Sequence, residues 1–363
     1  MTDSNLAALV EFFQSGCKKE RLLGVELEHF VINKKTRTPL PYQNGVAEIL
    51  RRFAPIFGTP VLSDGQIIGI TGKNSDISLE PAAQLEISIR PSSCLDEIRN
   101  TYDDFFAKIS PVLDEMNCEL LYAGTLENAL SLPLIPKRRY EIMDEHFKKT
   151  GTHGLQMMRG TAATQISIDY ESEADFSKKF RVACALTPIF SFLCDTTGKM
   201  HRTHIWNNVD PARSGIVPKS PDKTFTFLDY AKYIYDRPPI FILQENEPVY
   251  TANKPNSEIF AQKKLTTADI EHITSMAFPD VRLQNRIELR MADSLPIEKT
   301  LNFADLLKKI FYNEEILEKY FCETRDVKNI DVVEAKNALI KHGGDAKIYK
   351  KPIREWVREM ENL

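Results

Sequence analysis

The sequence predicts an α+β fold, in which a mainly antiparallel β-sheet forms a funnel-like bowl and helices cover its outer face. Four distant stretches alternate apolar residues with Glu, Gln and Arg, and this period of two is typical of strands. Segments with apolar residues at helical spacing separate the strands. No repeat or composition break marks a linker, so we expect one α+β domain over residues 1–363, with a core at 20–296 and a helical tail at 297–363.

Helices and strands alternate along the first part of the chain. Ser92 and Ser93 begin a long amphipathic helix that runs to about residue 117, and Asp96 and Glu97 in its first turn suit the helix dipole. The patterns also predict helices over 6–13 and 45–57 and strands over 25–32, 66–70, 77–79 and 85–89, the last ended by Arg90-Pro91.

The second part of the chain is richer in helices. Residues 199–221 lack a regular period but carry several polar and aromatic side chains, and loops of that length are usually functional or mobile. The basic segment 137–140 follows a loop marked by prolines. We expect strands over 119–123, 165–169 and 284–290, and helices over 174–193, 227–235, 266–277, 297–321, 332–341 and 352–360.

Charge and hydropathy exclude several classes of protein. The formal net charge of −4 and the absence of a long basic block argue against a general nucleic-acid surface. No apolar run approaches the ~20 residues needed to span a bilayer, and the N-terminus lacks the basic start and apolar stretch of a signal peptide. We therefore expect a cytoplasmic protein without a membrane partner.

The six cysteines are scattered, with no C-x-x-C pair and no zinc-like spacing to the seven histidines. Reduced, structural thiols are the main expectation. Cys184 and Cys194 lie in an apolar segment and should be buried, while a regulatory redox pair stays open.

The polar sides of the predicted strands are rich in carboxylates. Glu26 and Glu28 share one face of their strand, as Gln84, Glu86 and Ser88 share one face of theirs. An ordinary solvated face of an antiparallel sheet is the alternative. However, like charges on neighbouring strands repel unless cations lie between them, and hard cations such as Mg²⁺ bind oxygen ligands and bridge carboxylates to nucleotide phosphates. The pattern therefore favours a site for a divalent metal.

Familiar nucleotide and hydrolase motifs are missing. Residues 69–74 contain Gly and Lys but lack both the spacing and the Ser or Thr of a P-loop, and no G-x-G-x-x-G occurs. A nucleophile elbow and H-E-x-x-H are absent as well. The glutamate-rich sheet is therefore the leading candidate site.

An ordered set of motifs gives the chain a family resemblance. The set begins with Gly24-Val25-Glu26-Leu27-Glu28 and includes Ser78-Leu79-Glu80-Pro81, Pro136-Lys137 with Arg139-Tyr140, Arg202 with His204-Ile205-Trp206, and Glu288-Leu289-Arg290. Together these motifs cover roughly residues 24–296 and resemble those of glutamate-cysteine ligase of the plant and proteobacterial type, in the carboxylate-amine ligase superfamily.

The resemblance implies a fold related to the catalytic sheet of glutamine synthetase. It also implies ATP as co-substrate, Mg²⁺ with Mn²⁺ as the alternative metal, and phosphorylation of the γ-carboxylate of glutamate. The amine of cysteine then displaces phosphate to give γ-glutamylcysteine, the first step of glutathione biosynthesis. Metal ions and arginines must neutralise the meeting anions. A γ-glutamyl ligase with another amine acceptor, or a binding protein without catalysis, is the alternative.

Site residues follow by the same resemblance, residue by residue. Arg202 and Arg213 are expected to meet the substrate α-carboxylate or phosphate oxygens and so to act in catalysis, with surface ion pairs as the alternative. Trp206 could wall the glutamate pocket, and Thr161 and Gln165 could bond glutamate. The nucleotide phosphates would be met by Lys137, Arg139 and Arg290, and the metal ligands would be Glu26, Glu28, Glu80, Glu86 and Glu288, each with a solvated carboxylate as the alternative.

Some positions depart from the family pattern. Ala82-Ala83 stands where paired glycines are usual, Ser167 stands where Asn is usual, and the chain is shorter than the plant enzymes. The departures leave the ATP and metal chemistry in place but leave the acceptor amine open, because pocket size decides among amines. A monomer or a homodimer is expected.

Overall fold

A large antiparallel sheet organises the chain. The computed structural model describes residues 4–221, 224–245 and 247–363. Its nine-stranded sheet has the order β12-β13-β7-β1-β5-β4-β3-β2, with β6 also pairing β1, and every pairing in it is antiparallel. The predicted α+β class is confirmed. The strands are β1 Leu23–Asn33, β2 Gly58–Ser63, β3 Gln66–Gly72, β4 Ser75–Leu79, β5 Leu85–Ser92, β6 Cys118–Leu121, β7 Ala163–Ile168, β12 Val281–Leu283 and β13 Ile287–Asp293.

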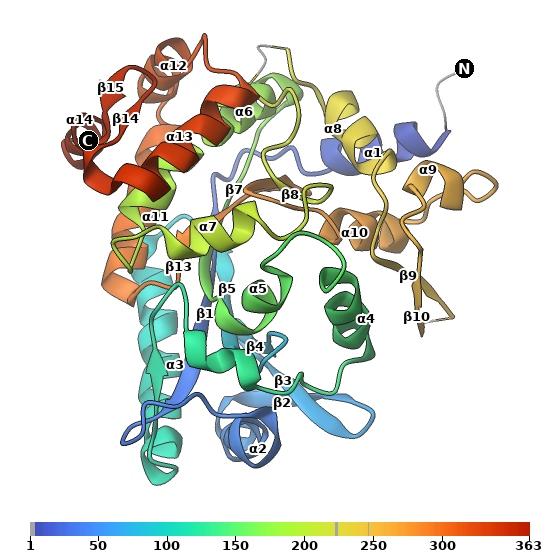
Figure 1. Ribbon diagram of the computed structural model, residues 1–363, viewed down its shortest axis with the longest axis vertical. Coiled ribbons are helices and arrows are strands. Elements are labelled where there is room, and N and C mark those ends of the chain that lie inside the picture. The colour runs from blue at the N-terminus through green and yellow to red at the C-terminus, as the bar shows by residue number, and fades with distance from the viewer. Residues whose placement is uncertain (1–3, 222–223, 246) are drawn as a thin grey trace.

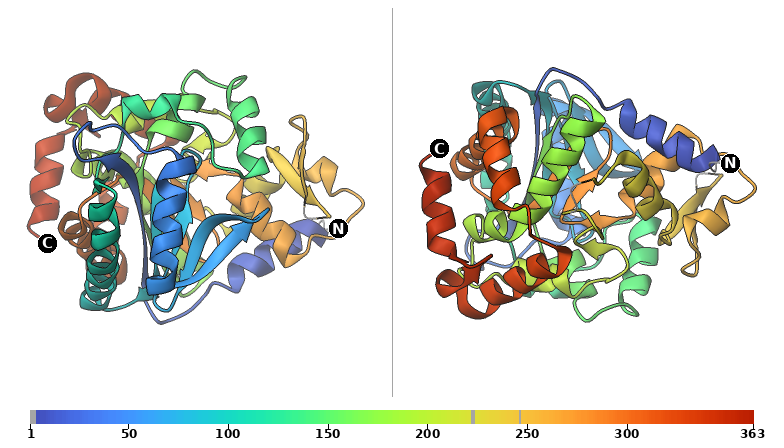
Figure 2. Two further views of the ribbon diagram at one scale, coloured as in Figure 1. Left: turned by 90° about the horizontal axis from the view of Figure 1, so that it is seen from below. Right: turned by 90° about the horizontal axis from the view of Figure 1, so that it is seen from above.

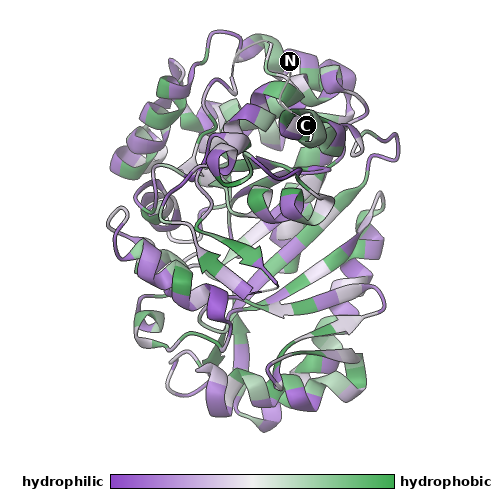
Figure 3. Cartoon of the chain, turned by 90° about the vertical axis from the view of Figure 1, so that its right-hand side faces the viewer, coloured by the Kyte–Doolittle hydropathy of each residue, from purple (hydrophilic) through white to green (hydrophobic). Residues whose placement is uncertain are grey.

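The central strands are amphipathic in the way the sequence predicts. Val25 and Leu27 of β1 are buried in the core, while Glu26 and Glu28 point to the other face and are partly accessible. Figure 3 shows the resulting stripes of hydrophilic and hydrophobic residues along the strands. Because side chains of a strand alternate between its two faces, the acidic residues of β1 and β5 come to lie on one side of the sheet.

Four long helices pack along the sheet and supply much of its core. Helix α2 contacts β3, α3 contacts β5 and β6, α6 contacts β12 and β13, and α11 contacts β7. Helices α2 and α3 also contact each other (Figure 2). Ser172 caps α6 by accepting a hydrogen bond from the Asp175 backbone N–H. These helices are α2 Ala47–Phe57, α3 Leu95–Glu115, α6 Glu173–Leu193 and α11 Ile297–Tyr312.

The polar side of the sheet, which the sequence predicts to form a bowl, is partly covered by helices. Three short helices, here called the roof helices, place side chains over it and line a small cavity. They are α4 Arg138–Phe147, α5 Gly154–Gly160 and α7 His201–Asn207. The sequence missed them because each is short and its apolar residues face a tertiary neighbour, so no long period is visible. The predicted loops at 137–140 and 199–221 are corrected accordingly, since they contain the start of α4 and all of α7.

The last part of the chain packs against α6 as a group of helices. The predicted helix 297–321 is interrupted at Asn313, whose side chain caps the next helix by accepting hydrogen bonds from the backbone of Glu315 and Ile316. Three helices of this group contact α6: α12 Glu314–Glu323, α13 Asn329–His342 and α14 Ile353–Glu361. They lie at the opposite end of the molecule from the hairpin of β9 Phe241–Gln244 and β10 Glu247–Tyr250 (Figure 1). The tail thus shares the core of the sheet domain.

The predicted strand over 284–290 is confirmed only from Ile287 onward. β12 ends at Leu283, residues 284–286 turn, and β13 begins at Ile287, so the segment is a hairpin. The predicted strand over 85–89 instead continues through Pro91 to Ser92. Helices α8 Phe227–Tyr235 and α10 Thr267–Ser275 agree with prediction, and both carry capping boxes. Elements without a prediction include β2, α9 Asn256–Ile259, β9 Phe241–Gln244 and β10 Glu247–Tyr250.

All six cysteines are free thiols, and Cys184 and Cys194 are buried as predicted. Within the described ranges, no helix combines the length and the apolar character needed to cross a membrane.

Candidate active site

Carboxylates from two neighbouring strands face each other on the polar side of the sheet. Glu28 of β1 stands directly opposite Glu86 of β5. Glu86 Oε1 accepts hydrogen bonds from Ser78 Oγ at 2.8 Å and Ser88 Oγ at 3.3 Å. Glu28 accepts one from the Ala163 backbone N–H at 2.7 Å. Each carboxylate is thereby fixed in direction by donors on adjacent strands.

The proximity of these carboxylates perturbs their titration. Burial and the charge of Glu80 raise the pKa of Glu28 to about 8. Burial and the charges of Glu26, Glu80 and Glu28 raise the pKa of Glu86 well above its ordinary value, and burial together with Glu288 raises the pKa of Glu26. Clustered carboxylates with raised pKa values gain stability from a bound cation, which removes both the desolvation cost and the repulsion.

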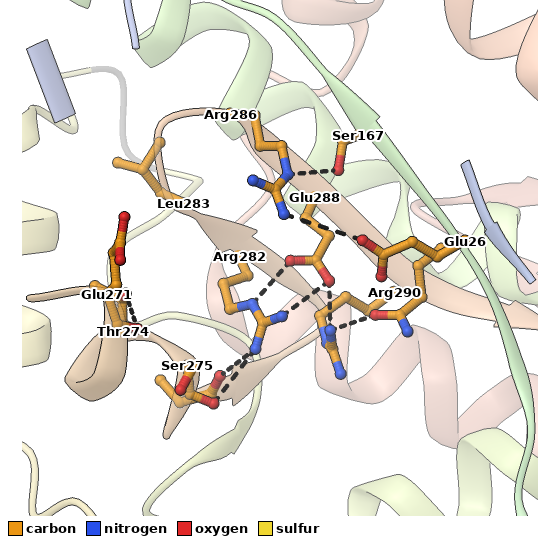
Figure 4. Close-up of polar contacts among 12 residues, drawn as sticks. Glu26, Ser167, Glu271, Thr274, Ser275, Arg282, Leu283, Arg286, Glu288 and Arg290 are labelled. Atoms are coloured by element: carbon orange, nitrogen blue, oxygen red, sulfur yellow. Dashed lines mark hydrogen bonds and ion pairs between the residues drawn. The ribbon is translucent and has the colours of Figure 1, made fainter. Parts of the chain in front are cut away.

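Glu288 is held in a different way. Arg282 forms a bidentate pair with its carboxylate, with Nε and Nη2 at 2.9 Å and 3.0 Å from the two oxygens, and Arg290 Nη1 lies at 2.5 Å (Figure 4). The carboxylate is buried, but the two guanidinium groups outweigh the burial and lower its pKa to about 2. In this structure the Glu288 carboxylate is therefore held in an ion-pair network with two arginines.

Glu26 lies at the edge of the same network. Its carboxylate is 4.0 Å from Arg286 Nη2, and Arg286 Nε donates to Ser167 Oγ at 3.1 Å (Figure 4). Arg286 belongs to the turn between β12 and β13, so the hairpin places one arginine against Glu26 and two against Glu288.

Glu80 is presented by a tight turn between β4 and β5. The Ala83 N–H donates to the Glu80 carbonyl at 2.9 Å, and Ala83 adopts a left-handed conformation with φ of +67°. Only glycine adopts this conformation without cost, which explains why a family pattern has glycine here. The Gln84 side chain braces the turn, because its Oε1 accepts from Ala82 N at 2.9 Å and its Nε2 donates to the Thr161 carbonyl at 3.0 Å.

A cavity of about 90 Å³ joins several of the predicted site residues. Its walls come from the sheet, from the turn after β4, and from the three roof helices. The lining residues are Glu28, Glu80, Pro81, Gln84, Tyr140, Met143, Met157, Met158, Thr161, Arg202, Trp206, Phe278 and Arg290. Six of the predicted residues are therefore brought together: Glu28, Glu80, Thr161, Arg202, Trp206 and Arg290.

Arg202 on α7 is anchored at the back of this cavity. It is buried, its Nη1 and Nη2 donate to the carbonyls of Met291 and Arg290 at 3.2 Å and 3.1 Å, and its guanidinium lies 5.5 Å from the Trp206 ring. Burial lowers the pKa of Arg202, while Asp293 and Glu28 act in the opposite direction. A buried guanidinium that lines the cavity can receive an anionic group.

Gln165 joins the two halves of the site. Its Nε2 donates to Glu28 Oε1 at 3.0 Å, and its Oε1 accepts from Arg290. The Thr161 hydroxyl donates to the Met157 carbonyl at 2.7 Å. In this arrangement both ends of the Gln165 amide bond protein partners, so it orients Glu28 and Arg290.

Two basic residues reach the rim near the carboxylates. Lys137 Nζ donates to the Leu79 carbonyl at 3.2 Å, and burial and Arg139 lower its pKa to about 8, whereas Glu80 and Glu86 raise it. Arg139 is exposed and stacks 4.7 Å from the Tyr140 ring, whose hydroxyl accepts from its Nη2. Both cations are placed to meet an anion that enters from solvent.

Arg213 does not join the cavity. It is buried with Asp210, with Nη1 at 2.6 Å from the carboxylate, and it also contacts His146 Nε2 at 3.1 Å and Asn253 Oδ1 at 3.1 Å. These contacts tie α4 to the segment after α7. The side chain is therefore engaged in the scaffold, in contrast to the substrate contact that the sequence predicts for it.

The carboxylates are ligands of the kind that a hard divalent cation prefers, but they do not form a complete coordination sphere by themselves. Glu26, Glu28, Glu80 and Glu86 offer oxygen donors of the kind that Mg²⁺ prefers. Among the described residues, however, no three acidic, His or Cys side chains converge closely enough to hold one ion. This pattern suits a metal whose remaining ligands are water and nucleotide phosphate.

Sequence reasoning missed two groups of residues here. Arg282 was not singled out, although recognition of the turn at 284–286 would have placed it directly opposite Glu288. Tyr140, Met143, Met157 and Met158 line the cavity from helices that the sequence did not reveal. Tyr140 lies in a motif of the family resemblance, but no local pattern gave any of the four a role in the site.

The chain shares its fold with a structurally characterised ligase. It is similar to the crystal structure of a glutamate-cysteine ligase from Francisella tularensis in complex with AMP, with a TM-score of 0.55, covering 95% of this chain and 78% of that one. The identity is 11%, so this likeness establishes the fold alone.

The sequence establishes the family. Residues 22–342 match glutamate-cysteine ligase family 2, and the chain belongs to that family. It is 32% identical over 340 residues to the chloroplastic glutamate-cysteine ligase of Nicotiana tabacum and 32% identical over 339 residues to that of Brassica juncea, with 88% of this chain aligned in each case. The chain spans 65% and 66% of the length of these two relatives.

Proposed function

We propose that the chain is an ATP-dependent ligase that joins the γ-carboxylate of L-glutamate to the amine of L-cysteine, giving γ-glutamylcysteine, ADP and phosphate. The observation that carries this proposal is the direct opposition of Glu28 and Glu86 beside a cavity lined by Arg202 and Arg290. Such a site can hold two anionic reactants together, which is the main barrier to phosphoryl transfer onto a carboxylate.

In the first step the glutamate γ-carboxylate attacks the γ-phosphate of ATP, forming an acyl phosphate and releasing ADP. Arg202 would hold the α-carboxylate of glutamate at the back of the cavity. Lys137, Arg139 and Arg290 would meet phosphate oxygens, and Gln165 would keep Arg290 in place. The amine then attacks the acyl phosphate and displaces phosphate, with no covalent bond to the protein.

Glu26, Glu28, Glu80 and Glu86 would hold Mg²⁺ or, as an alternative, Mn²⁺. The bound ion would neutralise charge on the phosphate oxygens. Glu288 is left out of this set because Arg282 and Arg290 already compensate it. The raised pKa of Glu28 supports the assignment, since a metal-free carboxylate there prefers to keep a proton.

Three methionines support a thiol-bearing acceptor. Met143, Met157 and Met158 give the cavity a soft, apolar wall, and polarisable thioethers suit a small sulfur-containing side chain better than a charged one. A cytoplasmic location and a monomeric or homodimeric state stay predictions, and the relatives named above are chloroplastic.

The test is an assay that identifies the product. Purified protein with glutamate, ATP, Mg²⁺ and a panel of amines should form γ-glutamylcysteine and release ADP with cysteine as the preferred amine by kcat/KM. A higher kcat/KM with another amine would change the acceptor. Absence of turnover with every amine would reject the ligase.

A further inference from the structure

A buried lysine from the C-terminal helices reaches the back of the candidate site. Lys336 of α13 is 3% exposed, and its Nζ donates to Asp280 Oδ2 at 2.7 Å. The Asp280 side chain is 11% exposed. A buried ammonium is costly unless an opposite charge meets it, so this pair fixes α13 against the segment that precedes β12.

Asp280 is joined to the site through the backbone. Its N–H donates to the Gly215 carbonyl at 2.9 Å, and its own carbonyl accepts from the Arg290 N–H at 3.0 Å. The Arg290 carbonyl in turn accepts from Arg202 Nη2 at 3.1 Å. Three consecutive polar contacts therefore connect Lys336 to Arg202.

The orientation of the Arg202 side chain depends on the backbone carbonyls of β13. Its Nη atoms bond only the carbonyls of Arg290 and Met291, and its buried Nε has no hydrogen-bond partner among the described residues. A second cavity, of about 10 Å³, is lined by Arg202, Trp206, Asp280 and Lys336. That volume has room for about one water molecule, so the protein packs closely around the guanidinium on this side.

We propose that Lys336 is a positioning residue for glutamate binding. Its ion pair with Asp280 holds the part of β13 whose carbonyls orient Arg202, so a helix far along the sequence sets the geometry of the anion-binding guanidinium. The inference rests on the proposed function, in which Arg202 receives the α-carboxylate of glutamate. Groups that orient the ligands of a metal site typically change metal affinity by about 10–100-fold when removed, and we expect an effect of similar size on glutamate affinity here.

The experiment compares Lys336→Met with Lys341→Met, which makes the same chemical change at an exposed position of the same helix. Calorimetry measures the Kd of glutamate and, separately, of ATP with Mg²⁺, and a thermal melt checks folding. We expect Lys336→Met to weaken glutamate binding about ten-fold and to leave ATP binding unchanged, whereas Lys341→Met binds both as the wild-type chain does.

Loss of one partner leaves Asp280 unpaired, so Lys336→Met could unfold. The double variant Lys336→Met/Asp280→Asn removes both charges and supplies the same measurement in a neutral background. A wild-type glutamate Kd in either folded variant overturns the inference while the proposed function stands. A wild-type chain that binds no glutamate overturns the proposed function, and the inference with it.

Discussion

Glu28 and Glu86 stand directly opposite each other across β1 and β5, with their carboxylates on the same face of the sheet. Like charges directly opposite on paired strands are destabilising. The opposed carboxylates therefore lower the stability of the metal-free fold. A cation bound between the two strands would offset their repulsion and is the simplest physical explanation for the pair.

The first prediction concerns pH and metal. Glu28 has a pKa of about 8 in the folded chain against an ordinary value of 4.5, so between these values the folded state holds a proton that the unfolded state has lost. With respect to this group, the stability of the metal-free protein should be highest below pH 4.5 and should fall as pH rises to 8. Mg²⁺ should therefore raise the Tm more at pH 8 than at pH 5.5, as measured by thermal melts with and without EDTA.

The second prediction concerns Glu86→Gln. The amide is neutral at every pH and removes the cost of either protonating or charging the Glu86 carboxyl group in the folded state, so the metal-free variant should melt higher than the wild-type chain at pH 8. Ligase turnover should nevertheless fall by at least about 100-fold, because a charged ligand beside the transferring phosphoryl group is lost. Glu355→Gln, an exposed position on α14, is the matched control. A variant with lower stability and normal turnover would make Glu86 a scaffold residue.

The third prediction concerns the buried network around Glu288. Arg282→Met leaves the Glu288 carboxylate, which is 1% exposed, with Arg290 as its one remaining close guanidinium. Breaking a buried pair in this way costs roughly 3–5 kcal/mol of unfolding free energy. The double variant Arg282→Met/Glu288→Met should regain much of that loss. Urea denaturation of the two variants checks the prediction, and equal stabilities would contradict it.

The fourth prediction separates two arginines that the sequence treats alike. Arg202→Met should raise the KM for glutamate about 10–100-fold, because the guanidinium that faces the cavity is gone. Arg213→Met should instead lower the free energy of unfolding by roughly 3–5 kcal/mol, since Asp210 loses its buried partner, with little change in KM. Steady-state kinetics and denaturation of both variants decide the assignment. A large rise in KM for Arg213→Met would return that residue to the substrate site.

Much of the scaffold could be predicted from local patterns. The alternation in β1 and β5 placed Glu26, Glu28 and Glu86 on one face correctly, because the pleat fixes side-chain direction residue by residue. Helix α8 agrees with its predicted bounds because a Thr226–Asp229 capping box marks its start.

The partners of these residues could not be predicted in the same way. Reading residues 284–290 as one strand hid the turn that sets Arg282 opposite Glu288, and the short roof helices gave no long period. Arg213 illustrates the same limit, because a buried ion pair and a substrate contact use the same residue type.

The sequence by itself determined the family, the strand faces and the acidic character of the site, since each of these depends on residue order along a few neighbouring positions. The tertiary structure alone decided which carboxylates stay uncompensated, which arginine lines the cavity, and that Lys336 lies behind it. The physical reason is that a charge is set by its residue, whereas its pKa, burial and partner are set by whatever distant segment folds against it.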